Sequence, residues 1–159
     1  MSLLRDKRFV AEHRGGPLKK EQHRQLMQWA IDCAEHVLPV FGDKLDPRLS
    51  NALKVAEEWR QGKASVGAAR NAAYEILKLA RELSNPVAIA VARSVGHAVS
   101  TAHMADHSLG AALYALKAIK NAEKSVEVER KWQEQKLPAD LRELVLSALE
   151  AERFKRFLN

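Results

Sequence analysis

The stretch that decides the fold is Pro86–Ile119, PVAIAVARSVGHAVSTAHMADHSLGAALYALKAI. Over these 34 residues the only formal charges are Arg93, Asp106 and Lys117. Both halves of the stretch are apolar on almost every side, which is typical of helices buried inside a protein. We therefore expect two central helices joined near Met104–Ser108, with other helices packed around them.

The segments on either side of this stretch also carry helical signals. Apolar residues recur at three-to-four spacing, and the pairs Asp46-Pro47 and Asn85-Pro86 each combine an N-cap with a first-turn proline. Pro17, after two glycines, suggests a further helix start. Pro138 suggests another, after a short charged helix. No segment alternates for long enough to predict a strand.

The sequence thus predicts an all-α, single-domain bundle of about six to seven helices around a buried, alanine-rich central hairpin. The chain has 159 residues, the length of one domain, and 25 of them are alanine. We expect residues 1–16 to form a basic N-terminal arm and residues 17–159 to form the helical domain.

Charge and cysteine content limit the classes of function. The net charge is +6, yet it is concentrated near the two ends of the chain, and the body is close to neutral. Cys33 is the only cysteine, which excludes an intrachain disulfide and suits a reducing compartment. The uncharged runs are too short or too interrupted to span a bilayer. We expect a cytoplasmic protein that has no membrane segment.

The candidate site is a cluster of polar residues in the apolar hairpin. His103 and His107 are four residues apart and would share a helix face, so they could form a two-ligand clamp for a divalent metal. His97 would join them if the helix breaks near Asp106. The polar cluster consists of Arg93, His97, His103, Asp106 and His107.

The same cluster has a structural explanation. Buried histidine and arginine side chains often hydrogen-bond helix ends, because unpaired buried polar groups cost about 1–3 kcal/mol. Asp106 or Ser108 could cap the second central helix, and an Arg93–Asp106 ion pair could lock the hairpin. An HxxxH spacing without the associated glutamate is a weak metal signal.

Signatures of other functions are few. The sequence has no GxGxxG, GxxxxGK[ST] or GxSxG motif, and Cys33 lies on an apolar stripe that predicts a packed core cysteine. No basic recognition helix is evident, so we do not expect nucleic acid as the partner. The candidate partner contacts are Trp132 on its charged helix and the N-terminal Arg5, Lys7 and Arg8.

Three stretches resemble a family of small bacterial all-helical proteins. They are DKRFVAEHRGG (6–16), ALKVAEEWRQGKASVGAAR (52–70) and ARSVGHAVSTAHMADHSLGAALYALKAI (92–119), the last being the most distinctive. The family is the immunity-five-like domain of polymorphic toxin systems, and the resemblance covers roughly residues 5–150. It implies a toxin–antitoxin role in which the protein binds a cognate toxin in the cytoplasm, without catalysis and without a cofactor.

Three hypotheses follow from the sequence. The first is an immunity protein that neutralises a bacterial toxin by occlusion. The second is a metal-binding helical bundle, or an enzyme, that uses the histidine and aspartate cluster. The third is a nucleic-acid-associated protein that uses its basic ends. Alanine-rich faces could also support a homodimer, and we expect exposed Phe154 and Phe157 to pack across such an interface.

Overall fold

The computed structural model describes residues 5–155 and 157–158, apart from the side chains of residues 152 and 153, and it confirms an all-α helical bundle. In chain order, the helices are α1 (Lys20–His36), α2 (Pro47–Arg60), α3 (Val66–Glu82), α4 (Pro86–Ser100), α5 (His107–Asn121), α6 (Val126–Lys136), α7 (Ala139–Leu149) and α8 (Glu152–Lys155). Three short 3-10 helices, η1 (Lys7–Phe9), η2 (Glu12–Arg14) and η3 (Leu38–Val40), lie outside them.

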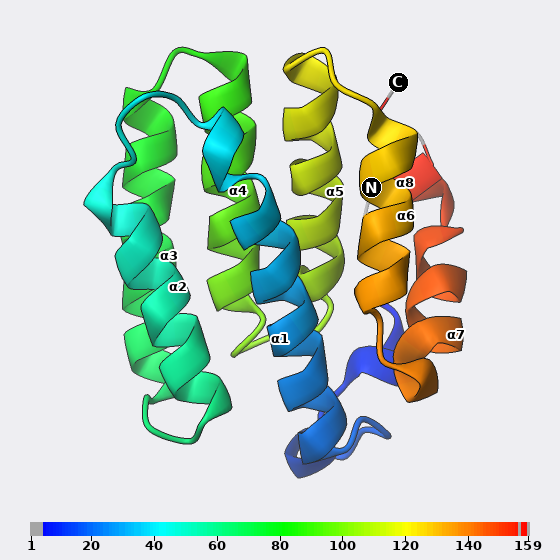
Figure 1. Ribbon diagram of the computed structural model, residues 1–159. Coiled ribbons are helices and arrows are strands. Elements are labelled where there is room, and N and C mark those ends of the chain that lie inside the picture. The colour runs from blue at the N-terminus through cyan, green and yellow to red at the C-terminus, as the bar shows by residue number, and fades with distance from the viewer. Residues whose placement is uncertain (1–4, 156, 159) are drawn as a thin grey trace.

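The hairpin of α4 and α5 is the centre of the bundle, as the sequence predicts (Figure 1). These two helices pack against each other more extensively than any other pair, and α1 packs across both of them. Helices α2 and α3 lie on one side of the hairpin, and α6 and α7 on the other (Figure 1). The N-terminal segment runs beneath the bundle, near the turn between α4 and α5 (Figure 1).

Small residues allow the central helices to approach closely. Two glycines show this directly, because an added Cβ atom would meet a neighbouring helix at each of them. A Cβ atom on Gly96 of α4 would lie 3.2 Å from Cγ2 of Ile76 on α3. A Cβ atom on Gly110 of α5 would overlap the His97 ring of α4. The alanine-rich composition therefore serves close helix packing around the hairpin.

The predicted helix starts at residues 46 and 85 are confirmed. The Asp46 side chain accepts a hydrogen bond from the Arg48 N–H, and Asn85 accepts from two N–H groups in the first turn of α4. The prediction from Pro17 is wrong by three residues, because α1 begins at Lys20. Leu18 is instead extended and donates its N–H to the carbonyl of Val10.

The residues before α1 pack on the bundle. Phe9 is 4% exposed and Leu18 is 2% exposed, and both belong to the apolar cluster that α1, α5 and α7 share. Gly16 lies so close to the carbonyl oxygen of Val10 that a Cβ atom there would be only 2.1 Å from it. This segment therefore forms a fixed wall beside the turn between α4 and α5.

The structure confirms the prediction for Cys33 and contradicts the prediction for Phe154 and Phe157. Cys33 is fully buried, and burial raises the pKa of its thiol, which confirms the core position. Phe154 and Phe157 are partly buried within the chain: Phe154 packs on the α7 cluster, and Phe157 meets the ring of Tyr114 edge-on. The expectation that these two phenylalanines are exposed is therefore wrong.

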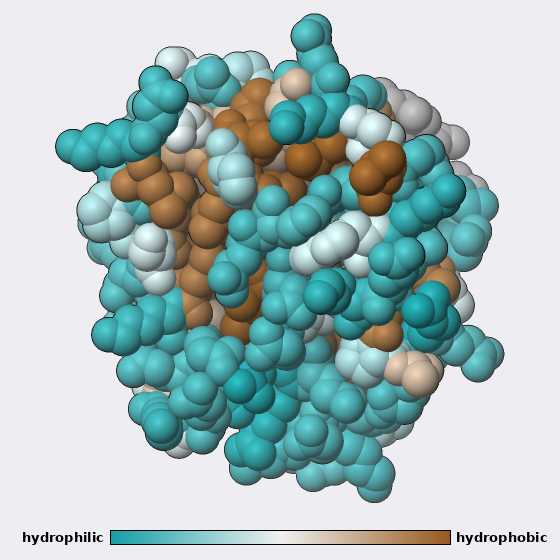
Figure 2. All heavy atoms as spheres, in the orientation of Figure 1, coloured by the Kyte–Doolittle hydropathy of each residue, from teal (hydrophilic) through white to brown (hydrophobic). Residues whose placement is uncertain are grey.

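The surface in the orientation of Figure 1 is hydrophilic over its lower part (Figure 2). A patch of hydrophobic residues is exposed in the upper part, beside the segment that links α1 to α2 (Figure 2). Leu38, Phe41 and Leu45 of that segment are partly buried and pack against the core of the bundle. Among the described residues, no helix is long and apolar enough to cross a membrane.

Candidate functional site

The three histidines of the hairpin lie together at its turn. His97 comes from the last turn of α4, His107 begins α5, and His103 lies in the turn between the two helices. Nδ1 of His97 is 3.0 Å from Nδ1 of His107, and the ring of His107 is 5.1 Å from that of His103, centroid to centroid. Tyr114 stacks on the other side of His97, with 5.2 Å between the centroids. The rings form a continuous row along the hairpin.

These histidines are neutral near pH 7. Burial, then the nearby His107 and Arg93, lower the pKa of His97 to about 4, although Asp106 acts in the opposite direction. Burial also lowers the pKa of His103 to about 4 and lowers that of His107. A neutral imidazole has one donor and one acceptor nitrogen. One of the two Nδ1 atoms therefore donates to the other.

In the described part of the chain, the three rings are not arranged as the ligands of one metal ion. Within residues 5–155 and 157–158, no group of three or more His, Cys, Asp or Glu residues could hold a metal ion. A close Nδ1–Nδ1 contact between neutral histidines is satisfied as a hydrogen bond. The geometry favours a structural polar network at His97 and His107.

Gly110 is the residue that makes room for His97. A Cβ atom at this position would lie 2.4 Å from Nδ1 and 2.7 Å from Cγ of the His97 ring, which is held between Tyr114 and His107. We expect Gly110→Ala to lower the free energy of unfolding by about 1–2 kcal/mol, since overpacking outweighs the better helix propensity of alanine. Urea unfolding measures this change.

Gly67→Ala is the matched control for this substitution. Gly67 lies in the first turn of α3, and its added Cβ atom would meet nothing closer than the Ser65 hydroxyl at 3.7 Å. This variant should be as stable as the original protein or slightly more stable. If Gly110→Ala behaved in the same way as Gly67→Ala, the close packing of His97 on α5 would be refuted.

Asp106 is held by the N-terminal segment. Nη1 of Arg5 lies 2.7 Å from both carboxylate oxygens of Asp106. The expected Arg93–Asp106 pair is therefore wrong, and Arg93 is exposed on α4. The Asp106 side chain makes no capping bond to α5, and the Ser108 hydroxyl donates to the carbonyl of Ala105. This ion pair fastens the chain start to the turn between α4 and α5.

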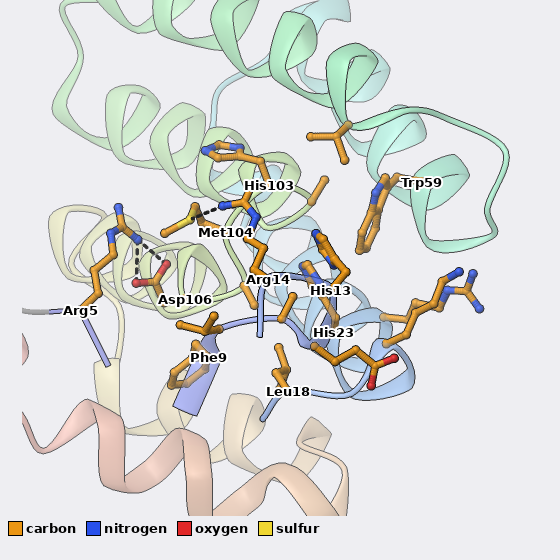
Figure 3. A pocket seen from close by; sticks show the side chains of 18 of the residues that line it. Arg5, Phe9, His13, Arg14, Leu18, His23, Trp59, His103, Met104 and Asp106 are labelled. Atoms are coloured by element: carbon orange, nitrogen blue, oxygen red, sulfur yellow. Dashed lines mark hydrogen bonds and ion pairs between the residues drawn. The ribbon is translucent and has the colours of Figure 1, made fainter. Parts of the chain in front are cut away.

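A cavity of about 470 Å³ opens between the N-terminal segment and this turn (Figure 3). That volume is within the range of ligand sites in proteins, roughly 300–1,000 Å³. Figure 3 shows Arg5 and Asp106 at one side of the cavity and Trp59 at the other. The apolar part of the lining includes Phe9, Leu18 and Trp59.

The three stretches that carry the family resemblance meet at this cavity. The first contributes Phe9 and Arg14, the second contributes Trp59, and the third contributes His103 and Asp106. Each stretch lies in a different part of the chain, and the fold brings them around a single opening. The distinctive motif thus has two parts: His97 packs inside the hairpin, while the turn after α4 faces the cavity.

Two histidines of the cavity have environments that lower their pKa. His23 of α1 is buried, and its Nε2 lies 2.6 Å from the carbonyl oxygen of Thr101. Burial is the largest cause of the lowered pKa of His23, although this hydrogen bond acts in the opposite direction. The Nδ1 atom of His103 is buried without a hydrogen-bond partner in the described part of the chain.

The remaining candidate contact residues do not line the cavity together. Arg8 is exposed and donates to Asp6 and to the Ser147 hydroxyl, and Lys7 is exposed. Trp132 is partly buried and stacks on His36, with ring centroids 3.5 Å apart and an angle of 4° between the planes. Among these candidates only Arg5 lines the cavity.

Sequence reasoning missed Arg14, His23, Arg24 and Trp59 as site residues. All four line the cavity, but they belong to the N-terminal segment, α1 and α2, far from the hairpin motif in the sequence. The one available signal was that Arg14 and Trp59 lie within stretches that resemble the family. That signal does not reveal that the stretches meet.

Comparison with known proteins gives a family match. One family model matches residues 16–140, from the end of the N-terminal segment to the first turn of α7. No curated protein and no solved structure matches the chain. Because the family match spans well over half of the chain, the protein belongs to the Imm-5 like putative immunity protein family.

Proposed function

We propose that the protein binds and neutralises a cognate bacterial toxin by occlusion, without catalysis, and that the toxin contacts the cavity and its rim. Family membership supports the general role. The observation that carries the choice of surface is the meeting of all three family-like stretches at one opening.

The lining of the cavity has the composition of a protein contact. Binding energy in protein interfaces is concentrated in a few tryptophan, tyrosine and arginine side chains around well-packed pockets. The cavity offers Trp59 together with Arg14 and Arg24, beside the apolar Phe9 and Leu18. A fixed scaffold limits the entropy lost on binding, and the Arg5–Asp106 pair fixes one wall.

Protection of growing cells tests this function. The toxin domain encoded by the neighbouring gene is expressed alone or together with this protein, and growth is recorded. Co-expression should restore growth. The double variant Arg14→Glu, Arg24→Glu should weaken the complex by at least about tenfold, since like charges or lost anchors at an interface cost several kcal/mol.

The matched control is Lys54→Glu, Arg81→Glu. Both residues are exposed, on α2 and α3, and neither lines the cavity. This control should protect cells as well as the original protein does. Loss of protection in both double variants, or in neither, would argue against the cavity as the toxin contact. Absence of protection by the original protein would refute the proposed function.

A further inference from the structure

The base of the cavity is apolar, and its edge carries cations. Phe9 and Leu18 are buried beneath it, and Trp59 lies against the ring of His23, with 4.8 Å between the centroids. Such a surface favours a ligand group with an apolar or aromatic body. The charged residues around it decide what else that ligand must carry.

Several of the charges around the cavity are already paired. Arg5 is bound to Asp106, and Asp6 is bound to Arg8. In the described part of the chain, the Arg14 side chain hydrogen-bonds only to a neutral atom, the sulfur of Met104, which lies 3.8 Å from its Nη1.

Lys20 and Arg24 also line the cavity, and like Arg14 they have no carboxylate partner among the described residues. Lys20 is exposed, and Arg24 is partly buried beside Gly62, where an added Cβ atom would lie 3.7 Å from its Nη2. Glu12 is the one lining carboxylate outside the ion pairs described. Within the described residues, the cavity lining therefore carries an excess of positive charge without carboxylate partners.

His103 adds a polar group without a partner. Its Nδ1 atom is buried and lacks a hydrogen-bond partner within the described residues, and Arg14 and Arg5 are close enough to help lower its pKa. This atom is enclosed by the protein, so the carboxylate of a ligand is expected to meet the cations at the edge of the cavity and not His103.

We propose, on the basis of the toxin-binding function above, that the cavity receives an acidic anchor: an aspartate or glutamate side chain next to an aromatic side chain, both carried by one segment of the protein partner. The aromatic side chain contacts Trp59 and the apolar base. The carboxylate lies between Arg14, Lys20 and Arg24, where charge-assisted hydrogen bonds are stronger than neutral ones.

The surroundings favour a protein segment over nucleic acid. A nucleic acid backbone is bound by a basic stripe that follows several phosphates. Here the uncompensated cations converge on one opening, Glu12 is among them, and the base of the opening is apolar. A single carboxylate on an aromatic body matches this arrangement in charge and in polarity.

Two dipeptides test the inference on the full chain without the toxin. N-acetyl-Asp-Phe-amide carries the acidic anchor, and N-acetyl-Asn-Phe-amide has nearly the same shape without the charge. Each peptide is added to labelled protein at concentrations up to the millimolar range. The assigned indole N–H signals of the tryptophans are followed by NMR. The acidic peptide should shift the Trp59 signal in a saturable way and leave that of buried Trp29 unchanged.

The charge of the peptide and of the cavity should both matter. The asparagine peptide should bind at least about tenfold more weakly than the aspartate peptide. Lys20→Gln, Arg24→Gln should weaken binding of the aspartate peptide about tenfold, whereas Lys54→Gln, Arg81→Gln should leave it unchanged. Thermal melting verifies that both double variants are folded.

Three results would overturn the acidic anchor: equal affinity for the two peptides, unchanged affinity in Lys20→Gln, Arg24→Gln, or no saturable shift at Trp59. These results are distinguishable from failure of the proposed function. If a stable toxin complex forms but the aspartate peptide does not bind, only the acidic-anchor proposal is refuted. If the peptide binds but no toxin complex forms, the proposed toxin-binding function is refuted, and recognition of an acidic group at this cavity is supported.

Discussion

Replacing Trp29 by alanine is expected to lower the free energy of unfolding by about 3–5 kcal/mol, the range for deletion of a large buried aromatic side chain. Trp29 is 2% exposed in the cluster formed by α1, α5 and α7. Its Nε1–H also donates to the backbone carbonyl of Gln133, at 2.9 Å, which ties α1 to α6. The melting temperature should fall by about 10 °C or more.

Trp59→Ala is the matched comparison for this variant. Trp59 is only partly buried and faces the cavity, so its loss should cost about 1–2 kcal/mol of stability and should weaken partner binding. The two variants thus distinguish the structural role of Trp29 from the expected binding role of Trp59. Equal losses of stability in the two variants, measured by urea unfolding, would contradict this assignment.

Acidification is expected to destabilise the protein through the histidines at the hairpin turn. The pKa of His97 is lowered from its ordinary value of 6.5 to about 4, mainly by burial. Between these pH values the unfolded chain binds a proton that the folded chain does not. The free energy of unfolding therefore falls as the pH decreases from about 6.5 to about 4, and it is independent of this group above that range.

The full effect of His97 is up to about 3 kcal/mol, and His103 acts in the same direction. Urea unfolding at a series of pH values between 7 and about 4 measures the slope. His97→Gln should reduce the slope, because glutamine does not titrate. Asn71→Gln, which changes an exposed residue that does not titrate, should leave it unchanged. A slope that was the same in all three proteins would show that His97 is not responsible.

The helices and the centre of the fold could be predicted from the sequence for physical reasons. The stretch from Pro86 to Ile119 is uncharged enough to require burial, and Asn85 and Asp46 mark helix starts through local hydrogen bonds. Such signals depend on neighbouring residues alone. The start of α1 departs from the local signal of Pro17 because a non-local bond, from Leu18 to Val10, keeps that residue extended.

The site could be predicted only in part. The hairpin motif contains His103 and Asp106, which line the cavity. The partner of Asp106 is Arg5, which lies 101 residues away in the sequence, so no local spacing could reveal it. Trp59 occupies an apolar helical stripe that is typical of a core residue, and only the arrangement of α2 beside the N-terminal segment leaves it at a cavity.

The central claim is that the toxin binds at the cavity, and hydrogen–deuterium exchange of the purified complex tests it most directly. On binding, exchange should become slower in residues 9–14, 59–66 and 102–106, the three segments that meet there. Helix α6 and helix α7 should be unaffected. Protection confined to those helices, or the absence of any complex with the neighbouring toxin, would contradict the account.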